Sequence, residues 1–208
     1  MTKLTLLSIV TVMTPFIDGD ARGSILEAAS AVFAEKGIDG VSMRHIAREI
    51  GVSATALYRH YDSKNALLAA ACKEGFAQFG AQIEETTRAA ATPLDALRDI
   101  GGVYVDFALD HPMHYDVMMI RPHQWALGPN PEQDPESFAS LVTLVEACQA
   151  AGQLRPGDAR EAAHQLWAAL HGVVSLAIAM PGEIRGLEPE PVRARASALV
   201  EAVIASLL

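Results

Sequence analysis

Apolar residues recur along most of this chain at the three- and four-residue spacing that gathers them on one face of an α-helix. Glycine, proline and capping residues punctuate the pattern, as at Gly37, Gly51, Thr92-Pro93 and Pro181. The pattern predicts an all-α protein with helices over residues 22–36, 42–50, 54–61, 63–83, 93–110, 136–151, 159–180 and 191–208, and a short Met-rich helix over 111–120. Residues 121–135 hold four prolines and are predicted to form a loop.

Two short helices joined by a tight turn are predicted within Val41–Lys64. Ser42 and Ser53 are suited to cap the first and the second helix, because a serine hydroxyl can accept a free backbone N–H. Gly51 supplies the backbone freedom that the sharp turn requires. The inward residues of the two helices are Ile46, Ala47, Ile50 and Leu57. This pattern is that of a helix-turn-helix, whose second helix enters the major groove of DNA.

The segments ILEAASAVFAEKGIDGVSMRHIAREIGVS and ALYRHYDSKNALL resemble the DNA-binding domain of the tetracycline-repressor (TetR) family. Phe33, Gly37, the turn Gly51-Val52-Ser53 and the Leu-Tyr…Tyr-x-Ser-Lys ending occur together and in order. One departure is Ala54-Thr55-Ala56, where the family often has Gly or Pro. The resemblance covers residues 25–79 and implies a three-helix DNA-binding domain.

Hydrogen-bond donors dominate the outward positions of this stretch, as contacts with phosphate and base edges require. Carried over from the family pattern, Ser53, Ala54 and Thr55 approach the bases, while Tyr58, His60 and Lys64 contact phosphates. The predicted DNA-binding set is Ser42, Met43, Arg44, Ser53, Ala54, Thr55, Tyr58, Arg59, His60, Tyr61 and Lys64.

The charge of the chain is distributed unevenly. The formal net charge is −9, which argues against indiscriminate binding to nucleic acid. Residues 20–65 carry six basic and six acidic side chains, whereas residues 66–208 carry nine basic and 18 acidic ones. DNA binding is therefore expected to depend on a few placed contacts, with two protomers adding theirs.

The helices predicted over 159–180 and 191–208 carry more apolar surface than one face of a monomer needs. We therefore expect a homodimer built on these helices, which also suits palindromic double-stranded DNA. The predicted dimerisation residues are Leu170, Val174, Ala177, Ala196, Leu199 and Val203.

The string LWAALHGVVSLAIAMP resembles the WHG-type C-terminal domain of one TetR branch, as does HPMHYDVMM. Methionine and aromatic residues near these strings are most simply core, yet methionine makes adaptable surfaces and ligand sites often lie between bundle helices. The candidate ligand-binding residues are Tyr104, Phe107, Met113, Met118, Met119, Trp125, Trp167 and His171. His171 is expected to be a polar group in a helix interface or in a pocket wall.

Other reactive residues have plainer interpretations. Cys72 and Cys148 lie in apolar helical patterns and are interpreted as reduced core thiols, with a redox switch as the alternative. His111 and His114 could share a metal, but no cysteine partner follows them. We expect no metal, no cofactor and no enzyme activity, because no catalytic or phosphate-binding motif occurs.

Residues 1–20 contain an apolar run, Leu4–Met13, that is far shorter than the roughly 20 residues of a membrane span. It is interpreted either as an arm that packs on a neighbouring surface or as an upstream extension with Met13 as the natural start.

The sequence thus predicts an arm or extension (1–20), a helix-turn-helix DNA-binding domain (21–65) and a helical-bundle domain for ligand binding and dimerisation (66–208). The expected function is that of a cytoplasmic, ligand-responsive transcriptional repressor, released from a palindromic operator by a small apolar effector. The alternatives are a regulator of the same type without a small-molecule ligand, or a helical carrier or enzyme for apolar small molecules. No membrane association is expected.

Overall fold

The computed structural model describes residues 21–120, 136–180 and 186–208, and all regular secondary structure in these ranges is helical. The helices are α1 (Ala21–Lys36), α2 (Met43–Glu49), α3 (Ala54–His60), α4 (Lys64–Ala89), α5 (Pro93–Asp110), α6 (Pro112–Tyr115), the π-helix η1 (Asp116–Ile120), α7 (Glu136–Ala150), α8 (Ala159–Ala179) and α9 (Pro189–Leu207). The all-α prediction is therefore confirmed.

Short-range chemistry sets the ends of these helices. The Ser42 and Ser53 hydroxyls accept the backbone N–H groups of His45 and Ala56 at 3.2 and 3.0 Å, which caps α2 and α3. Gly51 between them has a φ of 75°, a conformation that glycine adopts without strain. The predicted cap-turn-cap pattern of the helix-turn-helix is therefore confirmed.

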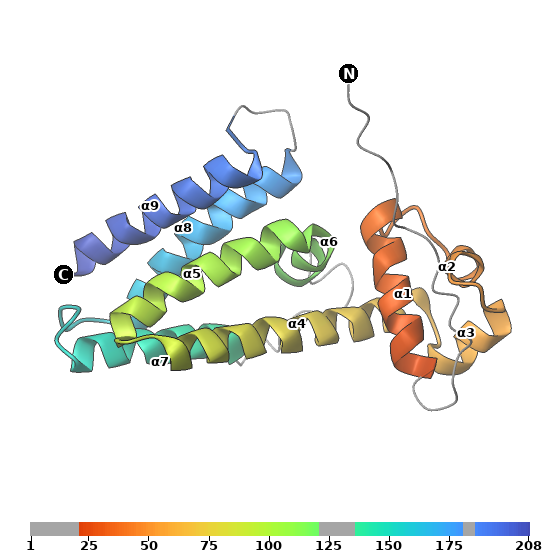
Figure 1. Cartoon of the computed structure of the whole chain (residues 1–208), viewed down its shortest axis with the longest axis horizontal. Helices are drawn as coiled ribbons and strands as arrows, with labels where there is room; N and C mark the ends of the chain where they lie inside the picture. Colours follow the sequence, from red (N-terminus) through yellow and green to blue (C-terminus); the bar gives the residue numbers. More distant parts are fainter. Residues whose placement is uncertain (1–20, 121–135, 181–185) are drawn as a thin grey trace, which may run out of the picture.

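The first three helices and the start of α4 form a compact head (Figure 1). Its centre is apolar and fully buried: Phe33 of α1, Ile46 of α2 and Leu57 of α3 have no exposed surface, and neither do Leu67 and Leu68 of α4. Because α4 contributes to this core and then continues along the body, one unbroken helix belongs to both parts (Figure 1).

The body is a bundle in which α5 packs against α4, α7, α8 and α9 (Figure 1). Gly101 lets α5 approach α9 closely, since a Cβ built there would lie 3.3 Å from Val200 Cγ2. Among the described helices, α8 is the one that is long and apolar enough to cross a membrane. One face of α8 packs against α5, α7 and α9, and this core packing covers 39% of its apolar window.

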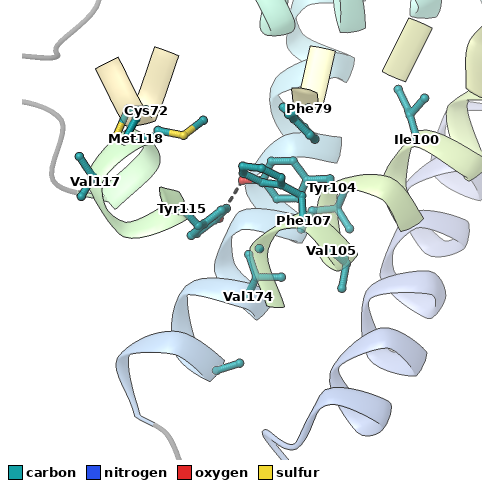
Figure 2. Close-up of a cluster of buried hydrophobic side chains, with 14 of the residues drawn as sticks. Cys72, Phe79, Ile100, Tyr104, Val105, Phe107, Tyr115, Val117, Met118 and Val174 are labelled. Atoms are coloured by element: carbon teal, nitrogen blue, oxygen red, sulfur yellow. Dashed lines mark hydrogen bonds between the residues drawn. The ribbon is translucent and has the colours of Figure 1, made fainter. Parts of the chain in front are cut away.

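The predicted Met-rich helix divides into α6 and the π-helical turn η1. Tyr115, Val117 and Met118 of this segment are buried (Figure 2), and α6 packs against α1, α4 and α5. The α6–η1 segment therefore touches both the head and the body.

Candidate functional site

Helix α3 presents donors on the outer surface of the head. Tyr58 is 48% exposed, Thr55 and Arg59 are exposed, and His60 is half-buried. Arg44 of α2 is exposed as well. Ser42 and Ser53 lie on the surface at the starts of α2 and α3, where free N–H groups favour contact with phosphate.

Two of the predicted DNA-binding side chains lie inside the head. Met43 is 5% exposed and Tyr61 is 3% exposed. The Tyr61 hydroxyl donates to the Arg22 carbonyl at 3.2 Å, and the Arg22 guanidinium lies 5.0 Å from the ring centroid. Their burial corrects the prediction, because these side chains hold the head together and have no surface to offer to DNA.

Lys64 joins α4 to the loop that follows α1. Its ammonium group donates to the Ile38 carbonyl at 2.9 Å, while the side chain remains half-buried. Ala54 is half-buried at the start of α3. Both therefore remain near the surface that the resemblance assigns to DNA.

Arg48 is an exposed basic residue that the sequence prediction left out. Its side chain is 71% exposed, and its Nη2 lies 3.3 Å from His45 Nδ1. Arg44 and Arg48 are four residues apart, so they lie on one face of α2. The four-residue spacing between Arg44 and Arg48 is the sequence signal that could have added Arg48 to the predicted DNA-binding residues.

Hydrogen-bonded aromatic side chains meet in the body in a group here called the tyrosine–histidine cluster: Tyr104, Tyr115, Trp167 and His171. The two tyrosines are buried, His171 is half-buried and Trp167 reaches the surface. The Tyr104 and Tyr115 hydroxyl oxygens are 2.7 Å apart (Figure 2). His171 Nδ1 lies 2.6 Å from the Tyr115 oxygen and 3.1 Å from the Tyr104 oxygen. Trp167 Nε1–H donates to the Tyr104 oxygen at 3.2 Å. Helices α5, α6 and α8 thus meet at four polar groups.

The cluster is electrically neutral near pH 7. Burial raises the pKa of Tyr104 to about 12, despite the opposing hydrogen bonds with Tyr115 and Trp167. Burial also raises the pKa of the Tyr115 hydroxyl and lowers the pKa of the His171 imidazole. The arrangement can therefore exchange hydrogen bonds with a polar group without changing charge.

Apolar side chains surround the cluster (Figure 2). The ring centroids of Phe79 and Phe107 are 4.8 Å apart, and that of Phe79 lies 6.1 Å from that of Tyr104. Met118 is buried, whereas Met113 and Met119 are partly buried against the core.

Most of the predicted ligand-binding residues thus lie in and around the cluster, although Trp125 is outside the described residues. Sequence reasoning missed Tyr115, which stands within the HPMHYDVMM string and is the buried centre of the cluster.

Within the described residues, the centre of the predicted effector region is packed: Phe107 is 6% exposed and Met118 is 5% exposed. Two surface hollows lie elsewhere, one of about 600 Å³ between α4 and α5 and one of about 160 Å³ between α5 and α9. Both are lined by charged residues, including Arg98 and Asp106, and neither is lined by a predicted ligand-binding residue. An effector that enters between the buried side chains of Phe107 and Met118 must displace them.

His111 and His114 lie near each other, but among the described residues they are not part of a larger group of metal-ligating side chains. The ring centroids of His111 and His114 are 5.9 Å apart. Within residues 21–120, 136–180 and 186–208, no third His, Cys, Asp or Glu joins them.

The predicted dimerisation residues divide into two groups. Leu170, Val174, Ala177 and Ala196 are buried within the protomer, and Leu199 and Val203 are partly buried against its core. The first four have no surface left for a partner, which corrects their assignment. The exposed apolar residues of α8 and α9 are instead mostly small, with charged residues such as Arg195 and Glu201 among them. They include Ala168, Gly172, Leu176, Ala179, Ala194, Ala198 and Ala205, and Trp167 is exposed as well.

Comparison with known proteins gives two matches, one to the head and one to the body. Residues 25–71 match "Bacterial regulatory proteins, tetR family", and residues 97–204, more than half of the chain, match "Tetracyclin repressor-like, C-terminal domain". A solved structure from Rhodococcus sp. RHA1, described as a protein with unknown function, is 29% identical with a TM-score of 0.74, over 93% of this chain and 98% of that one.

Two curated relatives are named for opposite effects on transcription. The HTH-type transcriptional activator FasR of Mycolicibacterium smegmatis is 25% identical over 76% of this chain and 69% of its own. The HTH-type transcriptional repressor KstR of Mycobacterium tuberculosis is 32% identical over 40% of this chain and 38% of its own. The chain spans between 32% and 72% of the length of seven curated relatives, the first of them over 57%.

Proposed function

The chain belongs to the tetR family of bacterial regulatory proteins, and on that basis we propose that it is a ligand-responsive repressor released from a palindromic operator by a small molecule. As a member of the tetR family, the chain is a helix-turn-helix transcriptional regulator, and the family is non-enzymatic. The observation that carries the proposal is α4, which starts in the core of the head and continues through the body. A change in body packing therefore acts directly on the DNA-binding head.

The proposed DNA-binding surface is the exposed side of α3 together with the starts of α2 and α3. Thr55, with the starts of these helices, faces the bases, and Tyr58, His60 and Lys64 face phosphates. In this proposal residues 21–65 form the head, residues 66–208 form the body, and the protein acts in the cytoplasm, where its DNA is.

We propose that two protomers associate through the outward faces of α8 and α9. The small side chains of Ala168, Gly172, Ala194 and Ala198 allow helices to approach closely, and Leu176 is 48% exposed there. An isologous dimer places two heads related by a twofold axis, which matches an inverted repeat with half-sites about one helical turn or a multiple apart.

The proposed effector site lies between α4, α6 and the tyrosine–histidine cluster. Met118 can change rotamer and open space beside Phe107, because methionine has a flexible side chain. Segment α6–η1 contacts α1, α4 and α5 through its helical part, so an effector that moves it shifts the population of head orientations. Trp167, His171 and Gly172 are the residues by which this body resembles the WHG type.

Repression is proposed over activation because an effector that misplaces the heads weakens operator binding. The names of FasR and KstR show that relatives act in both directions. A regulator without a small-molecule ligand is the second candidate, since Phe107 and Met118 at the proposed site are buried against their neighbours.

An electrophoretic shift with the DNA upstream of the protein's own gene tests the proposal, run with and without competitor DNA. Specific retention is expected, together with derepression of a reporter when an effector is present. A thermal-shift screen of a metabolite library identifies that effector. Retention that no compound in the screen reverses favours the regulator without a ligand, and loss of all specific retention overturns the DNA-binding proposal.

A further inference from the structure

We propose that the effector is amphipathic and uncharged, with an apolar body that ends in an oxygen acceptor bound by the His171 Nε2–H group. This inference rests on the proposed function: it names the chemical class of the ligand and extends its site past the tyrosine–histidine cluster to the α7–α8 side. It replaces the expectation of a purely apolar effector.

The hydrogens of the tyrosine–histidine cluster can be assigned one by one. Trp167 Nε1–H donates to Tyr104, the Tyr104 hydroxyl donates to Tyr115 at 2.7 Å, and the Tyr115 hydroxyl donates to His171 Nδ1 at 2.6 Å. Every hydrogen of the three donors is then used. Because a neutral imidazole accepts at one nitrogen and donates at the other, the His171 proton lies on Nε2.

The opposite assignment puts the weaker acceptor at the shortest contact. If Nδ1 carried the proton, it would donate to the Tyr115 oxygen at 2.6 Å, and the Tyr115 hydroxyl would donate to Ser175, a buried hydroxyl beside it that has no other partner among the described residues. A phenol O–H is the better donor of the pair and an unprotonated imidazole nitrogen is the better acceptor, so the Tyr115 hydroxyl donates to Nδ1. The Ser175 hydroxyl is then free to donate to the Tyr115 oxygen.

The Nε2–H group is therefore the remaining donor of the cluster. No hydrogen bond joins it to another group within the described ranges, whereas Nδ1 contacts both tyrosines. The two nitrogens lie on different edges of the ring, and His171 is half-buried. Nε2–H thus points away from the tyrosines and can meet an incoming oxygen.

Aromatic surface borders this donor along α8. The Trp167 and His171 ring centroids are 5.3 Å apart, and Phe138 of α7 lies 6.0 Å from Trp167 and 4.6 Å from His164. Trp167 is 36% exposed, so this aromatic wall reaches the surface. It offers an apolar path for a hydrocarbon body whose polar end lies at His171.

The charge of the ligand follows from the surroundings. Burial is the cause that lowers the pKa of His171, and none of the described basic side chains forms a hydrogen bond or ion pair with the cluster. Arg160 lies over Phe138, at the far end of the wall. An anionic head would therefore be buried without a counter-charge, so ketone, ester, ether or alcohol oxygens fit better than a carboxylate.

Four eight-carbon probes separate these possibilities in calorimetric titrations of the full-length protein at pH 7.5: 2-octanone, 1-octanol, octanoate and 1-chlorooctane. Octanone and octanol are expected to bind roughly threefold to tenfold more tightly than chlorooctane, the range that one net hydrogen bond supplies. Octanoate is expected to bind more weakly than octanone. Equal binding of octanone and chlorooctane, stronger binding of octanoate, or no binding by any probe overturns the inference.

Variants at position 171 locate the donor. His171→Phe keeps the ring shape but removes both nitrogens, so the octanone-to-chlorooctane ratio should fall to about one. His171→Gln keeps a donor and an acceptor, and should retain part of the preference. His45→Phe makes the same replacement on α2 of the head, away from the proposed ligand site, and should leave the ratio unchanged. A preference that persists in His171→Phe, or that also disappears in His45→Phe, overturns the assignment.

Operator release distinguishes this inference from the proposed function. If octanone and chlorooctane release the protein from DNA equally well, the ligand-responsive regulator stands and the polar-head inference fails. If the protein binds octanone preferentially but never binds an operator, the proposed function fails and the ligand class stands.

Discussion

Lys64 combines a structural bond with a predicted phosphate contact. Its ammonium group already donates to the Ile38 carbonyl at 2.9 Å. Lys64→Ala should weaken specific and nonspecific DNA binding similarly, and should lower the slope of log affinity against log salt by about one unit. Fluorescence anisotropy with labelled DNA across a salt series measures both effects.

Two further variants separate the charge of Lys64 from its bond to the head. Lys64→Gln keeps a donor for Ile38 and should show the same loss of salt slope with a smaller loss of stability. Lys73→Ala removes an exposed charge farther along α4 and should not change the slope. An unaltered slope in Lys64→Ala would remove this residue from the DNA interface.

Buried histidines give the stability of the body a pH dependence. Burial lowers the pKa of His171 from its ordinary 6.5, and burial followed by the neighbouring His111 lowers the pKa of His114. The unfolded chain then binds more protons than the folded one below pH 6.5, so the free energy of unfolding should fall as the pH drops from about 6.5 toward the folded-state pKa. It should not depend on these histidines above about pH 7.5.

Urea denaturation of the wild type and of His171→Gln at several pH values checks this prediction. The variant should lose part of the decline between pH 6.5 and pH 5. An equally steep decline in the variant would mean that His171 does not contribute.

Residue-level features were predictable where their causes are local. Ser42, Ser53 and Gly51 were identified because capping and turning depend on neighbours a few residues away. Tyr61 was placed on DNA although its side chain bonds to Arg22, 39 positions earlier. Tyr115 was missed because its partner His171 lies 56 positions later. No periodicity in the sequence specifies such distant partners.

At the scale of elements, Gly75 of α4 lies close to the α6–η1 segment. A Cβ built on Gly75 would lie 3.1 Å from the His114 ring and 3.8 Å from the Met118 sulfur. Gly75→Ala should therefore displace α6–η1 and weaken operator binding. It should raise the free energy of unfolding by less than the same substitution at an uncrowded helical position. Urea denaturation and operator titration measure the two effects.

Gly80 supplies the matched control on the same helix. Apart from its chain neighbours and the backbone of its own helix, no heavy atom of the described residues lies within 4 Å of a Cβ built there. Gly80→Ala should raise the free energy of unfolding by about 0.5–1 kcal/mol through helix propensity and leave operator binding unchanged. Equal gains in the two variants would show that the 3.1 Å contact imposes no constraint.

Residues 112–120 divide into the α-helix α6 and the π-helix η1, and a pattern of apolar residues cannot predict this difference in helix type. The pattern predicted one short helix there, and the segment is helical throughout. Whether its hydrogen bonds span four or five residues depends on how Tyr115, Val117 and Met118 are held by other helices. Such π-helical turns are rare and often lie at functional sites, in accord with the proposed role of this segment.

At the scale of the whole molecule, the proposed dimer depends on surface that the protomer leaves uncovered. Leu176 is 48% exposed on α8. Leu176→Glu should yield a folded monomer that loses operator binding, because two like charges would then face each other near the twofold axis. Sedimentation velocity at micromolar concentration, with circular dichroism to confirm the helical fold, tests this.

Position 199 provides the contrast. Leu199 is partly buried against the core of its own protomer, so Leu199→Glu should reduce the free energy of unfolding as well as dimerisation. A wild-type protein that sediments as a stable monomer would exclude the proposed interface. The sequence predicted which helices carry surplus apolar surface, but the inward positions depend on how α5, α8 and α9 meet.

The length of α4 has a consequence for how little motion regulation needs. Its 26 residues span about 39 Å, and Gly75 lies roughly 16 Å from Lys64 along the axis. A rotation of about 10° around the Gly75 contact would carry Lys64 some 3 Å, as far as the whole length of a hydrogen bond. In the proposed dimer, opposite rotations would change the separation of the two heads by about 6 Å against the roughly 34 Å between successive major grooves. The spacing of the major grooves is fixed by the DNA duplex. A repacking the size of one side chain is therefore enough to change the separation of the two heads so that it no longer matches that spacing.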